Sequence, residues 1–518
     1  MDIRAQLSMS FNLDKCIGCH TCSISCKNIW TTRQGAEYMW WNNVETKPGA
    51  GFPLTWEDQE RYRGGWEVSD SGNLRLKLIK GNKLRTLASI FFQPNLPTID
   101  DYYEPFTYDY QNLFNAPAGD DQPVARPKSL ITGDFMEKIT LGPNWDDDFG
   151  GSPLYGSNDP NLKGLSESQK EMLTKFHKLF YFYVPRICNH CLNPACVAAC
   201  PSGAIYKRGE DGIVLIDQDT CRAWRFCVSA CPYKKPYYNW ATGKSEKCIF
   251  CYPRTETAQP NACAHSCVGR IRTVGVLMYD AERIQEIAKL PDEKLVDGMR
   301  DIVLDPFDPK VIEAAKKAGI DGNWIAAAQN SPAYNLFKKW RISMPNHPEF
   351  RTLPMNTYIP PLSPILHQVK ADRGGLFDPE ADDFFNDIDK MRIPVKFLAN
   401  LLSAGNEKIV IESLKKQMAV RIYWRQKRVG DIGEKAVKSA LSSSGLTPQD
   451  CEDIYRLNSL ATYKERFVIP ETHRESKSTV DPRTMYEKRG TIGFGTKKKE
   501  LIGRQWYSLQ SNWLAFPE

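Results

Sequence analysis

The sequence lacks long apolar runs. Apolar stretches such as 179–184 (LFYFYV) and 274–279 (VGVLMY) are far shorter than the roughly 18 residues that a transmembrane helix needs. The start, MDIRAQLSMSFNLDKC, carries charges at Asp2 and Arg4 and lacks the apolar core of a signal peptide. We therefore expect no membrane span and no secretion signal in this sequence.

The sequence also has little excess charge of either sign. Its 518 residues include 68 Lys plus Arg and 62 Asp plus Glu, a formal net charge of +6. This excess is too small to indicate a nucleic acid partner, so we expect none. Hydrophobic residues make up 42% of the chain, as in an ordinary folded protein and unlike a disordered one.

Cysteine is absent from most of the chain, because 15 of the 16 cysteines lie in two short stretches. Four lie between residues 16 and 26 and eleven between 188 and 267, whereas Cys451 stands alone in a predicted helix and is expected to be an inert thiol. Disulfide scaffolds are typically short secreted chains, which argues against disulfides here. The clustering indicates metal ligands.

The clustered cysteines form four groups. They are Cys16, Cys19, Cys22 and Cys26; Cys188, Cys191, Cys196 and Cys200; Cys221, Cys227 and Cys231; and Cys248, Cys251, Cys263 and Cys267. Bacterial ferredoxins use this pattern, in which three cysteines hold one iron–sulfur cluster and the fourth binds the other cluster of a pair. Zinc also uses Cys-x-x-Cys, but it requires two separated pairs around one ion. Four such groups therefore favour iron–sulfur clusters over zinc.

The spacing of the groups predicts how they pair. The second and third groups are separated by only twenty residues, as in one two-cluster ferredoxin unit, so the first group is left to pair with the fourth. The predicted ligand sets are Cys16, Cys19, Cys22 and Cys267; Cys26, Cys248, Cys251 and Cys263; Cys188, Cys191, Cys196 and Cys231; and Cys200, Cys221 and Cys227.

The last set is one ligand short, because Trp224 stands where the pattern has a cysteine. An indole has an N–H donor and no lone pair for iron, and the neighbours Arg222 and Arg225 cannot bind iron either. We therefore predict three 4Fe–4S clusters and one 3Fe–4S cluster. The alternative is a fourth 4Fe–4S cluster completed by another side chain or by hydroxide.

The cysteine-rich stretch is also basic. Residues 181–275 contain twelve Lys plus Arg and six Asp plus Glu. These cations can compensate the negative charge of thiolate-bound clusters, or they can form a solvated face for an acidic partner or lipid headgroups. His20, His190 and His265 lie inside the cysteine motifs and are expected to be hydrogen-bonding or surface residues.

Local signals predict several elements. Residues 204–207 and 213–216 flank a Gly-Glu-Asp-Gly turn and predict a β-hairpin. Asp308-Pro309, Ser331-Pro332 and Thr447-Pro448 are helix starts, and 395–404 and 407–428 have helical spacing of apolar residues.

We predict an α+β fold of two bacterial-ferredoxin-like two-cluster units with large insertions and a helical C-terminal region. The predicted segments are 1–35, the first half of unit 1; 36–180, an irregular, partner-binding insertion with a few short strands; 181–240, unit 2; 241–280, the second half of unit 1; 281–465, a helical region; and 466–518, a basic extended tail.

Several motifs resemble the β subunits of respiratory nitrate reductases and of the kindred nitrite oxidoreductases. They include CIGCHTC, EYMWWNNVETKPG, IDDYYEPF, CNHCLNPACVAACPSGAIYKR, EDGIVLIDQDTCRAWRFC and SCVGRIR. The resemblance runs from residue 1 to about 467 and fades in the basic tail. In that family, tryptophan takes the position of the missing cysteine, as Trp224 does here.

The resemblance implies an electron-transfer subunit without a substrate site of its own. Its expected partners are a molybdenum bis-pterin catalytic α subunit and a haem b membrane subunit or another electron carrier. Such a subunit would lie at the cytoplasmic face of the membrane, peripheral through these partners. The alternatives are a β subunit of a related molybdenum oxidoreductase, acting on selenate, chlorate, perchlorate, dimethyl sulfide or ethylbenzene, and a structural adaptor held together by metal sites.

Overall fold

A long antiparallel pair of strands runs through the centre of the computed structural model, which describes residues 1–78, 93, 96–102, 104–120, 125–137, 156–157, 159–170, 180–364 and 392–471. Strand β1 (Ile3–Asn12) pairs with β12 (Arg272–Asp280) along its whole length. On its other edge β1 pairs in parallel with β14 (Thr357–Ile359), which pairs with β13 (Met344–Pro345). The sheet therefore joins the N-terminus to two distant parts of the chain.

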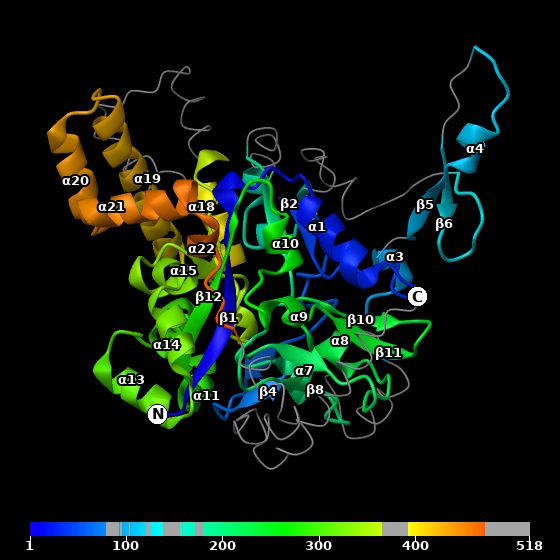
Figure 1. The fold of residues 1–518 in the computed structure, drawn as a ribbon, viewed down its shortest axis with the longest axis horizontal. Coiled ribbons are helices and arrows are strands. Elements are labelled where there is room, and N and C mark those ends of the chain that lie inside the picture. Colours follow the sequence, from blue (N-terminus) through cyan, green and yellow to red (C-terminus); the bar gives the residue numbers. More distant parts are fainter. Residues whose placement is uncertain are drawn as a thin grey trace.

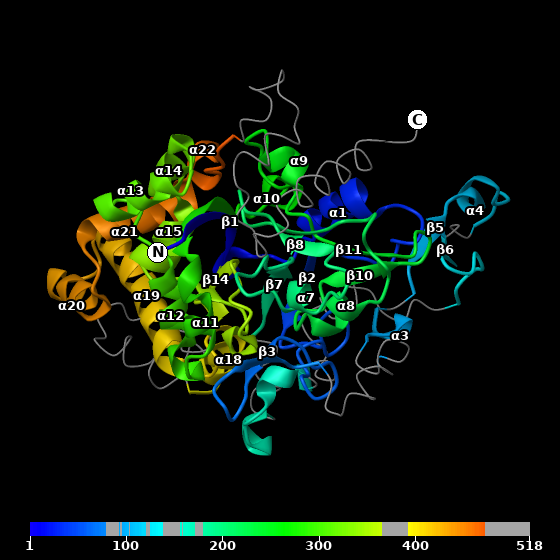
Figure 2. The same ribbon diagram turned by 90° about the horizontal axis from the view of Figure 1, so that it is seen from below.

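The β1–β12 pair separates two lobes (Figures 1 and 2). One lobe is helical and consists of α11 (Ile284–Ala288), α12 (Leu295–Ile302), α13 (Pro309–Lys317), α14 (Gly322–Gln329), α15 (Pro332–Tyr334), α18 (Arg392–Leu402), α19 (Glu407–Arg428), α20 (Glu434–Ser444), α21 (Pro448–Tyr455) and α22 (Tyr463–Arg466). None of the helices in the described ranges is long and apolar enough to cross a membrane.

The helix signals in the sequence are confirmed. The Asp308 carboxylate accepts a hydrogen bond from the backbone N–H of Lys310, and Gly319 follows the end of α13 with φ +81°. Thr447 forms a capping box with Asp450 at the start of α21. Helix α19 has the bounds that the apolar spacing predicts.

The other lobe carries the clustered cysteines on short elements. They are α1 (Thr21–Cys26), α7 (Ala195–Ala198), α8 (Phe226–Ala230), α9 (Tyr252–Thr255), α10 (Ala262–His265), β8 (Ile205–Lys207), β9 (Val214–Ile216), β10 (Pro236–Asn239) and β11 (Lys244–Lys247). Strands β8 and β9 form the predicted hairpin.

The segment between the first two cysteine groups contributes to the core. Its strand β2 (Asn43–Lys47) is buried throughout and pairs antiparallel with β7 (Phe182–Arg186). The sequence predicted a few short strands here but not that a strand containing Glu45 and Lys47 would be buried.

Farther along this segment lie β3 (Trp66–Val68), β4 (Leu74–Leu76), α3 (Ile99–Tyr102), β5 (Phe106–Asp109), α4 (Gln111–Phe114) and β6 (Arg126–Ser129). The β5–β6 pair and α4 project from the body (Figure 1). Parts of the predicted insertion, and the predicted basic tail beyond residue 471, lie outside the described residues.

Candidate iron–sulfur sites

The four cysteine loops share one backbone feature. The third residue of the Cys-x-x-Cys unit that opens each loop, or of its Trp224 counterpart, has a left-handed conformation: Gly18 has φ +64°, His190 +43°, Ala223 +61° and Phe250 +53°. This conformation costs residues with a side chain about 1–2 kcal/mol. Its recurrence at three residues other than glycine indicates that all four loops are held in the same tight shape.

The loop with Trp224 matches the first loop position by position. His20 in the first loop and Arg225 in the third both have left-handed φ, of +56° and +58°, and each immediately precedes a helix, α1 or α8. Trp224 therefore occupies the position of Cys19. Both residues are exposed, and the Trp224 side chain keeps 41% of its surface accessible.

The first predicted ligand set is brought together. Cys16, Cys19, Cys22 and Cys267 all line one cavity. Burial, together with the charges of Cys22 and Cys267, raises the pKa of the Cys16 thiol to about 12.

The second predicted set is also brought together, although its members come from opposite ends of the lobe's sequence. Burial raises the pKa of Cys26 well above its usual value, and the next causes are the charges of Cys263, Cys251 and Cys248. Helices α1 and α10 carry Cys26 and Cys263 into this group.

The remaining two sets lie beside each other. Burial, followed by the charges of Cys231, Cys188 and Cys191, raises the pKa of Cys196. Burial likewise raises the pKa of Cys227 to about 12, reinforced by the charges of Cys200, Cys221 and Cys231. Cys451 is buried elsewhere, in α21 of the helical lobe, as predicted.

The four thiol groups follow one another in space. Cys263 of the second set interacts with Cys22 of the first. Cys248 of the second set interacts with Cys188 of the third. Cys227 of the fourth set interacts with Cys231 of the third. The order along the series is therefore first, second, third, fourth.

The donor sets fit iron–sulfur clusters. Thiols bind metal as thiolates, and burial raises the pKa of thiols such as those of Cys26 and Cys196, so bound metal would be needed to stabilise their thiolates. N–H donors face the sulfurs: Trp30 Nε1 lies 3.2 Å from Cys251 Sγ, and Arg272 Nη2 lies 3.1 Å from Cys22 Sγ. In the part of the chain that the structure describes, no group of three or more His, Cys, Asp or Glu side chains is arranged to hold a single metal ion.

His190 and His265 have the roles expected, hydrogen bonding for His190 and a surface position for His265. His190 Nδ1 accepts a hydrogen bond from the backbone N–H of Val214 at 3.0 Å, and its ring meets Phe250 edge-on. Burial, together with Lys247, Lys207 and Arg208, lowers the pKa of His190. The His265 ring packs edge-on against Tyr463.

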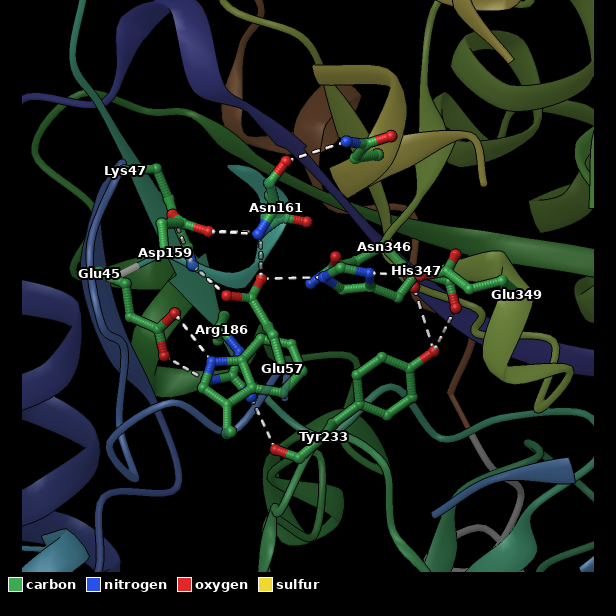
Figure 3. A network of polar contacts seen from close by, with 12 residues as sticks. Glu45, Lys47, Glu57, Asp159, Asn161, Arg186, Tyr233, Asn346, His347 and Glu349 are labelled. Atoms are coloured by element: carbon green, nitrogen blue, oxygen red, sulfur yellow. Dashed lines mark hydrogen bonds and ion pairs between the residues drawn. The ribbon is translucent and has the colours of Figure 1, made fainter. Parts of the chain in front are cut away.

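The sequence did not locate a buried ion network beside the third set (Figure 3). Lys47 forms an ion pair with Glu57 and lies 3.4 Å from Asp159. His347 lies between Glu57 and Glu349, with Nε2–Oε1 and Nδ1–Oε1 distances of 2.8 and 2.7 Å. Burial alone would lower the pKa of His347, but the two carboxylates raise it to about 9.

The network reaches the cysteine loops through Arg186. This side chain forms an ion pair with Glu45 and donates a hydrogen bond to the backbone oxygen of Tyr233 at 2.6 Å. Tyr233 lies two residues after Cys231, so the network supports the backbone of the third set.

Comparison with known proteins agrees with this arrangement. The model of the 4Fe-4S dicluster domain matches residues 179–277, which contain the last three cysteine groups, and the model of the respiratory nitrate reductase beta C-terminal region matches 362–448. The nitrate reductase beta chain of Bacillus subtilis is 52% identical over 497 residues, 95% of this chain and 98% of the relative. The chain belongs to the nitrate reductase beta-chain family.

Other relatives agree with this membership. The respiratory nitrate reductase 1 beta chain of Escherichia coli is 54% identical over 92% of this chain and 91% of its own length. The selenate reductase subunit beta of Thauera selenatis is 36% identical over 82% of this chain and 95% of its own length. As a member of this family the chain is an iron–sulfur electron-transfer subunit, as its motifs predicted.

The extent of the resemblance needs one correction. The motifs indicated that it fades after about residue 467. Because 95% of the chain aligns with the Bacillus subtilis relative, the similarity extends into the basic C-terminal region. Basic residues without apolar periodicity offered no motif from which this similarity could be recognised.

Proposed function

We propose that this chain relays electrons in nitrate reduction or nitrite oxidation, through three 4Fe–4S clusters and one 3Fe–4S cluster. Its proposed partners are a molybdenum bis-pterin catalytic subunit and a membrane haem b subunit or another carrier, which would hold the chain at the cytoplasmic face of the membrane. The observation that carries the proposal is the series of four thiol groups, each next to the following one.

The proposed ligand sets are those expected from the spacing. They are Cys16, Cys19, Cys22 and Cys267; Cys26, Cys248, Cys251 and Cys263; and Cys188, Cys191, Cys196 and Cys231 for 4Fe–4S clusters, with Cys200, Cys221 and Cys227 for the 3Fe–4S cluster. The charge interactions among the buried thiols support these sets.

We propose that the fourth cluster is incomplete because of Trp224. In its own loop this residue holds the position that Cys19 holds in the first loop, and the two loops have the same backbone conformation. Its indole offers iron no lone pair. The neighbouring guanidinium groups of Arg222 and Arg225 cannot supply a ligand.

The clusters, when bound, supply one-electron redox chemistry. The chain's own residues hold the thiolates in fixed loops, donate hydrogen bonds to sulfur, and exclude water from the middle of the series. All eight cysteines of the second and third sets are buried, whereas Cys19 at one end of the series and Trp224 at the other are exposed. Electrons can therefore enter at one end and leave at the other.

We choose nitrate or nitrite as the partner's substrate because this chain is more similar to nitrate reductase beta chains than to the selenate reductase subunit. The nitrate reductase beta chains of Bacillus subtilis and Escherichia coli are 52% and 54% identical to this chain, whereas the selenate reductase subunit is 36% identical. A subunit of a selenate, chlorate or dimethyl sulfide enzyme is accordingly the second choice.

The test is to purify the chain with the subunits that accompany it and to measure iron, acid-labile sulfide, and nitrate reduction by a reduced dye. We expect iron and sulfide in amounts that fit three complete clusters and one that lacks an iron. Cys227→Ala should lose cluster iron, whereas Cys451→Ala, a matched change of a buried cysteine outside the sets, should lose none. Zinc in place of iron would refute the relay, and a complex active on selenate but not nitrate would refute the substrate.

A further inference from the structure

Four lysines around the third ligand set are almost completely buried. Lys234, Lys235, Lys247 and Lys207 keep between 0 and 3% of their surface exposed. None of them forms an ion pair with an Asp or Glu among the described residues. Burying an ammonium group without a counter-charge costs several kcal/mol. A counter-charge is therefore to be expected close by.

Lys234 gives the clearest case. Its ammonium group donates hydrogen bonds to the backbone oxygens of Ser229 at 2.7 Å, Arg63 at 3.2 Å and Val228 at 3.4 Å. These neutral oxygens satisfy its donors but do not balance its charge. Burial lowers the pKa of Lys234 to about 7, and the charge of Cys231, a member of the third set, opposes this lowering.

Lys207 reaches the same set from strand β8. Its ammonium group donates to Gln6 Oε1 and the Gly212 backbone oxygen, both at 2.6 Å, and to the His190 backbone oxygen at 3.1 Å. Burial lowers the pKa of Lys207 to about 7, and the charges of Cys191 and Cys188 oppose this lowering. Asp211 also acts on Lys207, but its carboxylate is already in an ion pair with Arg208.

Lys235 and Lys247 lie between the second and third sets. Lys235 donates to Asn43 Oδ1. Burial and the charge of Arg186 lower its pKa to about 7, and the charges of Cys248 and Cys188, one from each set, oppose this lowering. Glu45 also acts on Lys235 but is paired with Arg186.

Lys247 donates to the backbone oxygens of Val214 and Cys248 and acts on both Cys248 and Cys196. The third set is thus surrounded by cations whose shared anionic neighbours are thiolates.

We propose that these four lysines are the counter-charges of the cluster held by Cys188, Cys191, Cys196 and Cys231, and that they raise its reduction potential. The inference rests on the proposed function. Reduction adds one electron, taken from the reductant, and breaks no bond, so the cluster becomes one unit more negative. Nearby positive charge stabilises this reduced state more than the oxidised state.

A purely structural role makes a different prediction. Lys234 also satisfies carbonyl groups at the end of helix α8, as lysines at helix C-termini commonly do. If this were the whole role of Lys234, removing its charge would change the stability of the complex and leave the reduction potential of the cluster unchanged. The reduction potential therefore distinguishes the two roles.

The experiment is a redox titration of the purified whole complex, followed by EPR, with Lys234→Gln and Lys27→Gln. Glutamine keeps a donor for the carbonyl groups and removes the charge. Lys27 serves as the control, since it also donates to backbone oxygens, those of Ala36, Glu37 and Met39, but its charge interacts with Glu37 and with Cys26 of the second set.

Lys234→Gln should lower the potential of one 4Fe–4S signal by at least a tenfold change in the reduction equilibrium, about 59 mV for one electron. Lys27→Gln should move a different signal.

An unchanged potential in Lys234→Gln, with full iron content, overturns the inference and leaves the relay standing. If Lys234→Gln does not retain iron, Lys207→Gln decides in the same way, because Lys207 interacts with other cysteines of the same set, Cys191 and Cys188. Absence of 4Fe–4S signals from the unmodified complex would instead refute the proposed function.

Discussion

Buried lysines at two neighbouring places in the molecule are balanced in different ways. Lys47 is fully buried in the ion network, where Glu57 and Asp159 provide its counter-charge. Lys234 is equally buried beside the third ligand set, where neutral backbone oxygens, the Tyr62 ring and Cys231 lie near it. The ion network contains its own anions, so its stability does not depend on iron. On the cysteine side, the proposed clusters would supply the counter-charge.

The largest expected effect is that of removing iron. Chelation under reducing conditions should leave the buried lysines without their counter-charge and open the cysteine-bearing lobe, because metal binding and folding are coupled. Hydrogen exchange should show lost protection at β8 and β9 and retained protection in α19 and α21. An equal loss of protection in both lobes would show that the helical lobe also depends on bound iron.

Removing Lys47 should have the next largest effect. Lys47→Met leaves Glu57 and Asp159 buried with one cation fewer, and breaking such a buried pair costs about 3–5 kcal/mol. Urea unfolding of the purified complex measures the loss, and EPR should find the cluster potentials unchanged. A stability equal to that of the unmodified complex would contradict the role assigned to the network.

The network should also make stability depend on pH. The pKa of His347 is raised to about 9 in the folded chain, from 6.5, by Glu349 and Glu57. Its stabilising contribution is therefore complete below pH 6.5 and is lost as the pH rises through 9, about 3 kcal/mol in all. Urea unfolding between pH 6 and 10 tests this, with His347→Gln as the control that should lack the decline.

An exposed lysine should matter least. Lys163 forms an ion pair with Glu60 at 2.9 Å, but both side chains are at least 80% exposed. Solvent screens such pairs, so Lys163→Met should change stability by less than about 0.5 kcal/mol and should leave every cluster potential where it was. A larger change would mean that burial does not explain the effects expected for Lys47 and Lys234.

The sequence predicted the parts of the fold that depend on local signals. Caps and apolar spacing located α13, α19 and α21, and a turn between two apolar strands located β8 and β9. The cysteine spacing and Trp224 also led to the family, which the comparisons confirmed.

Other features could not be predicted, because they depend on distant partners. The pairing of β1 with β12 joins segments far apart in the chain. The left-handed backbone at His190, Ala223 and Phe250 follows from the shape of the loops and not from residue type. The excess of lysines and arginines was visible in the sequence, but which of them are buried, and which lack carboxylates, depends on the three-dimensional packing.

The central claim is that one of the four clusters lacks an iron because Trp224 replaces a cysteine. Low-temperature EPR of the oxidised complex tests it most directly, in the unmodified form and with Trp224→Cys. We predict a 3Fe–4S signal in the oxidised unmodified complex. In Trp224→Cys this signal should be missing, and an additional 4Fe–4S signal should appear after reduction. A 3Fe–4S signal that persists in Trp224→Cys, or is missing from the unmodified complex, would contradict the claim.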